Sequence, residues 1–401
     1  MEQFDFQNQK VLIRVDFNVP LNKALEITDD TRIQAALPTI KYILEKGGAV
    51  ILMSHLGRPL KKLNDDGSIN RARFTLNHVV PRLSEHLGQA VAFVGDTVGT
   101  AVNEAVAALN AGDVLVLENT RFYKEEGKGD ADFAKQLADL ADFYVNDAFG
   151  TAHRAHASTT TVAQFFDTDH KSFGFLLEKE LLNAAKVTNE PARPLTSIVG
   201  GAKVSDKILL LDKMIEFVDN LVIGGGMAYT FKKAQGGQIG NSLCENDKLD
   251  LALSLLEKAK ARGVNVYLPE DSIIADQFSP TANTDTAASN EIRADYMGLD
   301  IGPKAIEAFK TVILDSKTIV WNGPMGVFEM EAFATGTKSI AESVAAATKK
   351  GAFSLIGGGD SVAAVKMMKL DDQVSYVSTG GGAMLELLEG KELPGVKAIK
   401  G

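Results

Sequence analysis

The chain of 401 residues has a single cysteine and no long apolar segment. The one thiol, that of Cys244, excludes an internal disulfide, and without a second cysteine nearby it makes a poor metal site. No run approaches the roughly eighteen uninterrupted apolar residues that a membrane-spanning helix needs. The opening stretch MEQFDFQNQK also lacks the basic and then apolar pattern of a signal peptide. We therefore expect a cytoplasmic protein without membrane contacts.

Basic residues are outnumbered by acidic residues, and the formal net charge is −10. This excess of carboxylates argues against broad, nonspecific binding to nucleic acid or to an anionic membrane. It does not exclude a small anionic ligand, because a local cluster of basic residues decides that. Residues 1–170 hold all six histidines and eight of the eleven arginines, whereas 22 of the 31 lysines come later. The two halves of the chain therefore offer different cation chemistry.

Apolar runs of strand length recur along the whole chain, which is long enough for two domains. These runs are continuous rather than alternating, and most are separated by stretches with helical periodicity. That pattern indicates parallel sheets buried on both faces. We predict an α/β protein with two doubly wound, Rossmann-like domains. The expected strands begin at residues 11, 49, 91, 114 and 143 in a first series and at 196, 221, 264, 318, 353 and 374 in a second.

The segment 173–194 separates the two series of strands. Its first part spaces apolar residues as one helical face, and two prolines end the pattern before the next strand. We expect a first domain over 1–172, a helix joining the domains over 173–187 and a second domain over 188–387. From the pattern alone, an ordinary helix of either domain is an equally good interpretation of residues 173–187.

Polar and basic side chains follow the expected strands of the first series. In open parallel sheets, ligands bind beyond the carboxyl ends of the strands. Arginine binds carboxylate or phosphate oxygens in pairs and keeps its charge at any accessible pH. A single arginine is more often an ordinary surface residue, but the shared position of four after consecutive strands favours a site for a small, multiply charged anion. The same strand ends supply His153 and His156, although such histidines are more often capping or loop residues. The expected binding set comprises Asp16, Asn18, Arg32, His55, Arg58, Arg121 and Arg154.

Strands of the second series end in glycine clusters instead, such as VGGAK, IGGGM and IGGGD. Glycine lets the backbone approach a ligand closely and turn its N–H groups toward it, as in a phosphate cradle. A plain tight turn is the common alternative for one such cluster, but it explains several of them poorly. No stretch matches the P-loop or the dinucleotide fingerprint, so the phosphate chemistry is of another type.

Two lysines and an aspartate accompany these glycines. Lys203 and Lys207 stand four residues apart, so on an opening helix they would point the same way. A solvated pair is the usual alternative, but beside a glycine cradle a lysine can reach a transferring phosphate. Asp360 suits Mg²⁺, which accompanies nucleotide phosphates and accepts carboxylate ligands. A helix N-cap, with Ser361 as the first helical residue, is the competing interpretation of Asp360.

These motifs resemble the phosphoglycerate kinase family from end to end of the chain. The matching stretches are RVDFNVP at 14–20, SHLGRP at 54–59, ENTRF at 118–122, GTAHRAH at 150–156, GGAKVSDK at 200–207, GGGMAYTF at 224–231, WNGPMGVFE at 321–329, GGGDS at 357–361 and STGGGAMLELLEG at 378–390. The resemblance implies reversible transfer of the acyl phosphate of 1,3-bisphosphoglycerate to MgADP, giving 3-phosphoglycerate and MgATP in glycolysis. It also implies direct in-line transfer, closure about a hinge, a monomer, and a C-terminal tail, about 388–401, that packs back on the first domain.

The resemblance further implies roles for individual residues. Phosphoglycerate would be held by the seven residues of the first series named above, and Asp360 would bind the magnesium ion of the nucleotide complex. Ser361, where threonine is common, and Thr120, where an apolar residue is usual, are small departures from the family pattern. The groups expected to stabilise the transferring phosphoryl group belong to Arg32, Lys203, Gly358 and Gly381. The nucleotide would be bound by Lys203, Lys207, Gly224, Gly225, Gly226, Gly298, Asn322, Pro324, Glu329, Gly357, Gly358, Gly359, Asp360 and Ser361.

Two other classes of protein stay open at this point. A two-lobed binding protein that captures an anion without chemistry would explain paired domains and a hinge, although not two lobes with different anion chemistry. A nicotinamide-dependent oxidoreductase is disfavoured by the absent dinucleotide fingerprint. Phosphoryl transfer to or from a carboxylate needs no general base, because the nucleophile is already an anion, and the expected set indeed offers no obvious pair of base and nucleophile.

Overall fold

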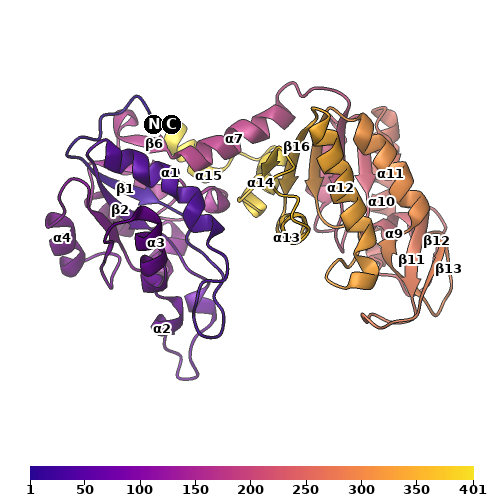
Figure 1. Ribbon diagram of the computed structural model, residues 1–401, viewed down its shortest axis with the longest axis horizontal. Helices are drawn as coiled ribbons and strands as arrows, with labels where there is room; N and C mark the ends of the chain where they lie inside the picture. The colour runs from indigo at the N-terminus through magenta and orange to yellow at the C-terminus, as the bar shows by residue number, and fades with distance from the viewer. The chain divides into compact units, whose positions relative to one another are not determined.

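The computed structural model describes residues 1–401, which form two compact units. Unit 1 is formed by Met1–Leu181 and Glu392–Gly401, and unit 2 by Leu182–Lys391. Each unit is built on a parallel sheet of six strands (Figure 1). The prediction of an α/β protein with two parallel-sheet domains is therefore confirmed.

The sheet of unit 1 has the strand order β3-β4-β2-β1-β5-β6. Val11 of β1 pairs with Val50 of β2 on one side and with Phe143 of β5 on the other. Strands β2, β4 and β5 are buried at every position, which explains why their sequences are continuous apolar runs. The strands are β1 Lys10–Arg14, β2 Ala49–Met53, β3 Ala92–Phe93, β4 Val114–Val116, β5 Phe143–Asn146 and β6 Lys171–Phe173.

Helices cover both faces of this sheet. Successive residues of a strand point to opposite faces, so Val11 and Leu12 of β1 belong to different cores. Val11 packs with Ile40 of α1 and Leu83 of α3, whereas Leu12 packs with Phe133 of α6. The helices of unit 1 are α1 Thr31–Glu45, α2 Arg71–Phe74, α3 Val80–Leu87, α4 Thr100–Ala107, α5 Lys124–Lys128, α6 Ala131–Ala138 and, near the C-terminus, α15 Pro394–Lys400.

The large sheet of unit 2 has the order β10-β8-β7-β15-β16-β17. On one of its faces Trp321 of β15 and Ile198 of β7 pack with Phe309 of α11 and Val344 of α12. The strands are β7 Leu195–Val199, β8 Asn220–Ile223, β10 Asn265–Tyr267, β15 Thr318–Asn322, β16 Phe353–Gly357 and β17 Tyr376–Val377. The helices are α8 Ile208–Met214, α9 Met227–Ala234, α10 Leu249–Ala261, α11 Pro303–Asp315, α12 Thr335–Lys349, α13 Gly359–Met367 and α14 Gly382–Leu388.

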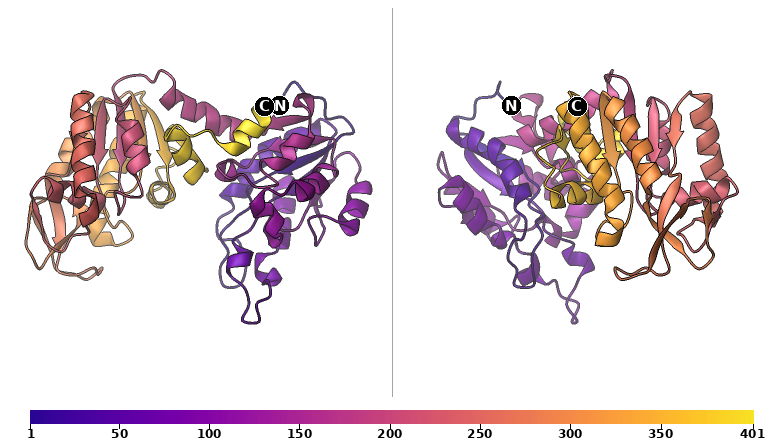
Figure 2. Two further views of the ribbon diagram at one scale, coloured as in Figure 1. Left: turned by 180° about the vertical axis from the view of Figure 1, so that it is seen from behind. Right: turned by 45° about the vertical axis from the view of Figure 1, so that its right-hand side comes forward.

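Unit 2 also contains two small sheets that the sequence did not predict (Figure 2). The larger is antiparallel, with β11 Asp271–Ala275 between β12 Thr284–Ala288 and β14 Met297–Ile301. The smaller pairs β9 Gln238–Ile239 with β13 Glu291–Ile292. Strand β12 has no fully buried residue, whereas β11 and β14 are mostly buried, and Ile239, Ile274 and Ile292 of the small sheets share a core with Tyr229 of α9.

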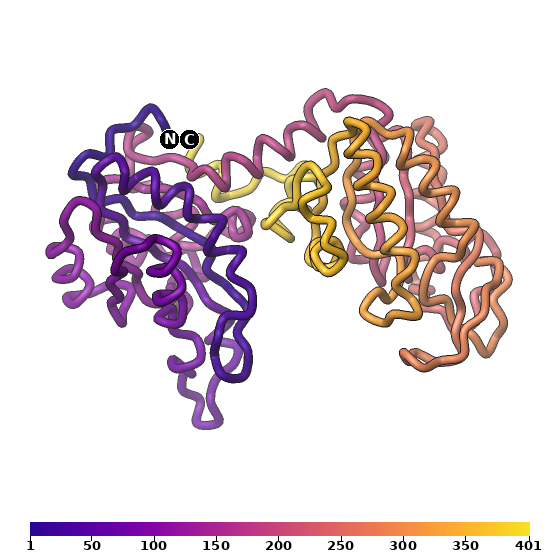
Figure 3. The backbone as a smooth tube through the Cα atoms, in the orientation of Figure 1, coloured from indigo at the N-terminus to yellow at the C-terminus, as the bar shows by residue number.

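Helix α7, Phe175–Thr188, begins in unit 1 and ends in unit 2. It lies over the segment where the sequence predicts a helix that joins two domains. The tail returns to unit 1 (Figure 3). There the Gly395 N–H donates to the Ala152 carbonyl at 2.8 Å, and Ile399 joins the core. None of the helices combines the length and apolar character needed to cross a membrane.

Candidate active site

In unit 1 the residues expected to bind an anion follow β1, β2, β4 and β5. These strands are neighbours in the sheet, in the order β4-β2-β1-β5, so their carboxyl ends share one edge. The order of the strands reverses at β1, because the chain adds β2 on one side of it and β5 on the other. Such a switch point is where open α/β sheets bind their ligands.

Asp16 and Asn18 connect the loops at this edge. The Asp16 carboxylate is 8% exposed and accepts a hydrogen bond from the Arg32 guanidinium at the start of α1. Asn18 Oδ1 accepts a hydrogen bond of 2.7 Å from the Gly57 N–H, which ties the loop after β1 to the loop after β2. Because 37% of the Arg32 side chain is still exposed, the arginine is oriented by Asp16 while part of it faces solvent.

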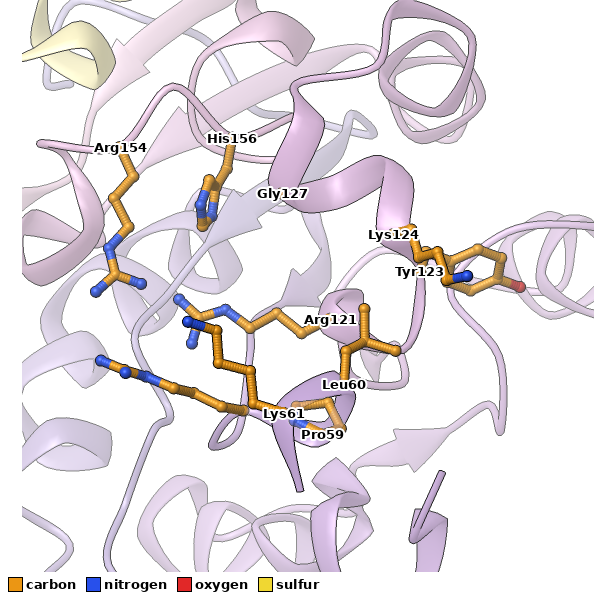
Figure 4. Close-up of a pocket in the computed structure, with 10 residues that line it drawn as sticks. Pro59, Leu60, Lys61, Arg121, Tyr123, Lys124, Gly127, Arg154 and His156 are labelled. Carbon is orange, nitrogen blue, oxygen red and sulfur yellow. The ribbon is translucent and has the colours of Figure 1, made fainter. Parts of the chain in front are cut away.

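A cavity of about 390 Å³ opens at the same edge. The nitrogen ends of Arg121, Arg154 and Lys61 point toward one space (Figure 4). Three of the four predicted arginines line this cavity, and Arg32 lies outside the lining, beside Asp16. The lining comprises Arg58, Pro59, Leu60, Lys61, Arg121, Tyr123, Lys124, Gly127, Arg154 and His156. The cavity therefore combines an apolar wall with a dense group of cations.

Arg121 is a partly buried cation of the lining. Its Nη1 donates to the Gly57 carbonyl at 2.8 Å, whereas its buried Nη2 has no hydrogen-bond partner in the protein. Burial, and then the nearby charges of Arg14 and Arg154, lowers the pKa of Arg121 to about 10, so the side chain stays protonated at neutral pH. A donor that is buried and unpaired is costly unless a ligand satisfies it, which favours a bound anion here.

Two charged residues behind the cavity were not predicted as part of the site. Arg14, the last residue of β1, is 0% exposed, and so is Glu126 of α5. Ser158 joins them, because Arg14 Nε donates to its hydroxyl at 2.8 Å and that hydroxyl donates to Glu126 Oε1 at 2.6 Å. In the apolar run VLIRV, Arg14 stands where a buried strand normally has an apolar residue. This charged residue within a buried strand is the feature of the sequence that could have indicated a role for Arg14 in the site.

Two histidines contact this buried network. His55 is 3% exposed, and burial together with four neighbouring arginines holds its pKa well below the usual value. His156 Nδ1 lies 3.8 Å from Glu126 Oε1. Burial lowers the pKa of His156 to about 4, so the ring is neutral at pH 7 even beside the carboxylate. Both histidine rings are therefore uncharged, although the arginines around them are positively charged.

In unit 2 the glycine loops after neighbouring strands interlock through backbone hydrogen bonds. The Gly201 N–H donates to the Pro324 carbonyl and the Gly225 N–H to the Met325 carbonyl, both at 3.1 Å. Gly225 has a φ of +71°, and a Cβ at this residue would lie 2.5 Å from the Gly201 carbonyl oxygen. Only glycine fits such a contact, so the close approach of these loops depends on the glycines.

The loop after β16 meets the end of β15 in the same way. Gly358 has a φ of +85°, and a Cβ there would lie 2.9 Å from Asn322 Nδ2, a buried amide nitrogen without a hydrogen-bond partner. The Ser361 side chain is 0% exposed, and its hydroxyl accepts a hydrogen bond of 2.5 Å from the Gly323 N–H. Ser361 therefore braces two loops with its hydroxyl rather than presenting it to solvent.

Lys207 and Asp360 are the charged residues of this region. The Lys207 ammonium is half-buried and donates to Asn322 Oδ1. Burial lowers the pKa of Lys207, and the nearby carboxylate of Asp360 partly opposes this effect. Asp360 is exposed in the first turn of α13. The charges of Lys207 and Asp360 are thus close enough to interact, and both residues lie beside the glycine loops.

Two details of the sequence interpretation are wrong. Helix α8 begins at Ile208, so Lys203 is an exposed loop residue and the argument that one helical face carries both lysines fails. Gly358, and not Asp360, occupies the N-cap of α13. Helix α8 therefore starts later than the pattern suggests, whereas α13, which begins at Gly359, starts two residues earlier.

The remaining predicted positions are spread over unit 2. Gly357 ends β16, Gly359 begins α13 and Gly381 precedes α14. Glu329 is exposed in the segment after β15. Gly298 is buried in β14 of the small antiparallel sheet, with its N–H donating to Ser242 Oγ at 2.9 Å.

Comparisons with known proteins agree on one family. The model of the family described as phosphoglycerate kinase matches residues 1–391. The phosphoglycerate kinase of Porphyromonas gingivalis is 50% identical, and the match covers 100% of both chains. The cytosolic phosphoglycerate kinase of Nicotiana tabacum is 52% identical over 100% of this chain and 97% of its own. The structure of phosphoglycerate kinase from Coxiella burnetii matches with a TM-score of 0.88 at 41% identity, covering 100% of this chain and 98% of that one.

Proposed function

The chain belongs to the phosphoglycerate kinase family, and from this premise we propose how its residues share the work of the reaction. The activity is the ATP:3-phosphoglycerate phosphotransferase reaction of glycolysis. In one direction the acyl phosphate of 1,3-bisphosphoglycerate passes to ADP, and in the other the carboxylate of 3-phosphoglycerate attacks the terminal phosphate of ATP. We propose below which residues bind each substrate and which stabilise the phosphoryl group during its transfer.

We assign the glycerate substrate to unit 1. Its carboxylate and phosphate need fixed cations, and Arg58, Arg121 and Arg154 line one cavity. The unpaired Nη2 of Arg121 supports this assignment, because a phosphate oxygen would satisfy it. Asp16 and Asn18 orient the loops and offer acceptors to the hydroxyl group of the glycerate, and His55 is the neutral donor of the set.

We assign the nucleotide to unit 2. The loops that contain Gly201 and Gly225 are interlocked by their own backbone hydrogen bonds, and they form a rigid floor beside the loop of Gly358, whose backbone N–H groups we propose as phosphate donors. Lys207 adds a cation beside them. The unpaired amide nitrogen of Asn322 is a further donor. Peptide N–H groups and a lysine are the usual partners of nucleotide phosphates in sites without a P-loop. Glu329 and Pro324 follow β15 and are proposed to contact the nucleoside.

The transfer step needs placement and charge neutralisation rather than acid–base catalysis. The migrating phosphoryl group spreads negative charge over three oxygens, and donors placed around those oxygens stabilise the transition state. We propose Arg32 from unit 1, with Lys203 and the N–H groups of Gly358 and Gly381 from unit 2. Because these groups belong to different units, catalysis requires the units to meet around both substrates. Such closure also keeps water away from the acyl phosphate.

A magnesium ion fits the chemistry of Asp360. Mg²⁺ prefers carboxylate and phosphate oxygens, and the Asp360 carboxylate is exposed in the first turn of α13 with Lys207 as its neighbour. When bound with the nucleotide, Mg²⁺ neutralises charge on the phosphate oxygens. Asp360 would hold the ion, while Lys207 and the glycine N–H groups would orient the phosphates.

The observation that carries this division is the unlike chemistry of the two units, guanidinium groups in one and glycine amides in the other. It is tested by steady-state kinetics of Arg58→Ala and Lys207→Ala. We expect Arg58→Ala to raise the KM for 3-phosphoglycerate about tenfold with the KM for MgATP unchanged, and Lys207→Ala to do the reverse. Variants that raise both KM values equally would contradict the division.

Closure, the oligomeric state and the location have their own tests. We propose that small-angle scattering records a smaller radius of gyration only when 3-phosphoglycerate and a MgATP analogue are present together. Unchanged scattering with both ligands would remove closure from the mechanism. We also propose a monomer in the cytoplasm, which sedimentation of the purified chain and fractionation of cells would check.

A further inference from the structure

The His55 ring has its tautomer set by one contact. His55 follows β2, and its Nδ1 is 3.2 Å from Nη2 of the fully buried Arg14. Arginine carries N–H donors and no acceptor, so Nδ1 must accept the hydrogen bond. A neutral imidazole that accepts at Nδ1 has its proton on Nε2. The alternative, an Nδ1–H donated to Asp16, is excluded by the 3.9 Å between Nδ1 and Asp16 Oδ1, which is too long for a hydrogen bond.

Arg14 is held in place at its other nitrogen atoms. Nε donates to Ser158 Oγ at 2.8 Å, and Nη1 donates to the carbonyl of Val15. The Ser158 N–H and hydroxyl both donate to Glu126, at 2.9 and 2.6 Å, so the fully buried carboxylate balances the fully buried guanidinium through one serine. A guanidinium fixed on several sides presents Nη2 to His55 in one orientation.

The surroundings of the ring also oppose a second proton. Burial is the largest cause of the low pKa of His55, followed by the charges of Arg14, Arg121, Arg32 and Arg154. Asp16 is the carboxylate that faces the ring, and it is engaged by Arg32. An imidazolium would therefore add a positive charge among four others with no free counterion.

We propose that Arg14 is a positioning residue that holds His55 in the Nε2–H form, so that the ring is a neutral hydrogen-bond donor to an oxygen of the glycerate substrate across the physiological pH range. The inference rests on the proposed place of His55 in the substrate site. A neutral donor binds the carboxylate and phosphate oxygens without titrating, so His55 contributes no pH dependence to binding although histidine usually titrates near pH 6.5.

The tautomer is measured on the full-length protein labelled with ¹⁵N-histidine. Proton–nitrogen correlation spectra report which ring nitrogen carries a proton, and His55→Gln identifies the signals of His55 by their loss. We expect a protonated Nε2 and an unprotonated Nδ1 from about pH 5 to about pH 8. A proton on Nδ1, or on both nitrogens, within that window would overturn the proposal, and this measurement needs no variant of Arg14.

The pH dependence of the KM for 3-phosphoglycerate distinguishes a positioning role of Arg14 from a merely structural one. Arg14→Met removes the donor and the charge, so we expect the KM for 3-phosphoglycerate to rise about tenfold at pH 8 and to fall toward lower pH as His55 gains a second proton. The substrate phosphate itself titrates near pH 6, so the ratio of variant to wild-type KM is compared across pH. Arg14→Lys, which keeps a cation, should restore a flat ratio. A ratio for Arg14→Met that is independent of pH would contradict the proposal.

Ser158→Ala is the matched control, because it removes a partner of Arg14 but leaves the contact with His55. We expect its His55 tautomer to match wild type. Adding 3-phosphoglycerate to labelled wild-type protein tests the substrate role separately, through a shift of the Nε2 signal. An Nε2–H tautomer with no such shift, and with the KM unchanged in His55→Gln, would remove His55 from the substrate site while leaving the effect of Arg14 on the tautomer intact.

Discussion

Unit 1 and unit 2 differ in the chemistry of the sites that we propose for phosphate groups. Around the cavity of unit 1 the donors are arginine side chains such as Arg121 and Arg154. In unit 2 the loops are built from glycines whose N–H groups and carbonyls interlock, with Lys207 and Asp360 as the neighbouring charges. One receptor is made of side chains, and the other is made chiefly of backbone.

The two proposed sites also differ in what the surrounding protein must provide to stabilise them. Clustered guanidinium groups repel one another, and unit 1 includes buried or nearly buried carboxylates, Glu126 and Asp16, to balance them. The backbone receptor has no comparable charge to balance, but it requires loops that approach closer than any Cβ allows, as at Gly225. We therefore expect substitutions that change charge to impair ligand binding in unit 1. In unit 2 we expect the damaging substitutions to be those that replace a glycine and so restrict the backbone.

The largest effect is expected from Arg32→Ala. If this guanidinium stabilises the migrating phosphoryl group, its loss lowers kcat by about a hundred- to a thousand-fold. The KM for MgATP should change little, because Arg32 belongs to unit 1. Arg293→Ala is a control, since Arg293 is an exposed arginine paired with Asp285, and it should leave kcat unchanged. Equal losses of kcat and of nucleotide affinity in Arg32→Ala would contradict its role.

Gly225→Ala tests the backbone receptor. We expect the free energy of unfolding of unit 2 to fall by about 3 kcal/mol or more, and the KM for MgATP to rise, because the new methyl group overlaps the Gly201 carbonyl. Gly67→Ala is the matched control: its φ is +80°, but no atom lies within 4 Å of the added Cβ. It should cost about 1 kcal/mol from backbone strain alone. Denaturant unfolding that gives equal losses for the two variants would exclude the close contact as the cause.

A buried carboxyl in each unit makes stability depend on pH. Burial raises the pKa of Asp147 in unit 1 to about 6 and that of Asp300 in unit 2 to about 7. A carboxyl whose pKa is higher in the folded state ionises first in the unfolded state, so stability falls as pH rises between the two values. Between about pH 5 and about pH 7 we expect losses of about 2 kcal/mol from Asp300 and about 1 kcal/mol from Asp147.

These two contributions are separated by Asp300→Asn and Asp147→Asn. Each variant should flatten the pH dependence of the unfolding transition of its own unit, measured by calorimetry at several pH values. The other unit acts as the internal control. If either variant keeps the wild-type slope, that carboxyl does not titrate in this range.

Among the changes in activity, the smallest effect is expected from Asp360→Asn. Loss of the carboxylate should raise the magnesium concentration needed for half-maximal activity about tenfold, while the KM for 3-phosphoglycerate stays unchanged. Asp371→Asn is a control, because Asp371 is an exposed aspartate of the same unit that lies after α13. Activity with an unaltered magnesium dependence would remove Asp360 from the metal site.

The main sheets could be predicted because their strands are buried on both faces. A run such as AVILM at 49–53 has no polar position, and the structure forms β2 over the same residues. Strand β6, Lys171–Phe173, and strand β12, Thr284–Ala288, went unrecognised. Edge strands and exposed strands lack the apolar signal, because one or both of their faces meet water.

The gathering of the arginines could be predicted by residue type and by position after the strands, while their role in binding stays a prediction. Arg58, Arg121 and Arg154 were expected there, and the structure gathers them around one cavity. Lys61 of the same lining was missed, because a lysine in an exposed loop has no distinctive pattern. Glu126 was missed for a related reason, since a glutamate in the stretch KEEGK reads as a solvated residue until packing buries it.

The sequence by itself determined the chemical inventory of this protein: parallel strands from continuous apolar runs, arginines after one series of them and glycines after the other. Tertiary structure alone decided which of those groups meet, because contacts such as Arg14 with His55 join residues 41 positions apart. It also decided protonation, since the pKa of a buried group depends on the desolvation and the neighbouring charges that only the packed chain creates.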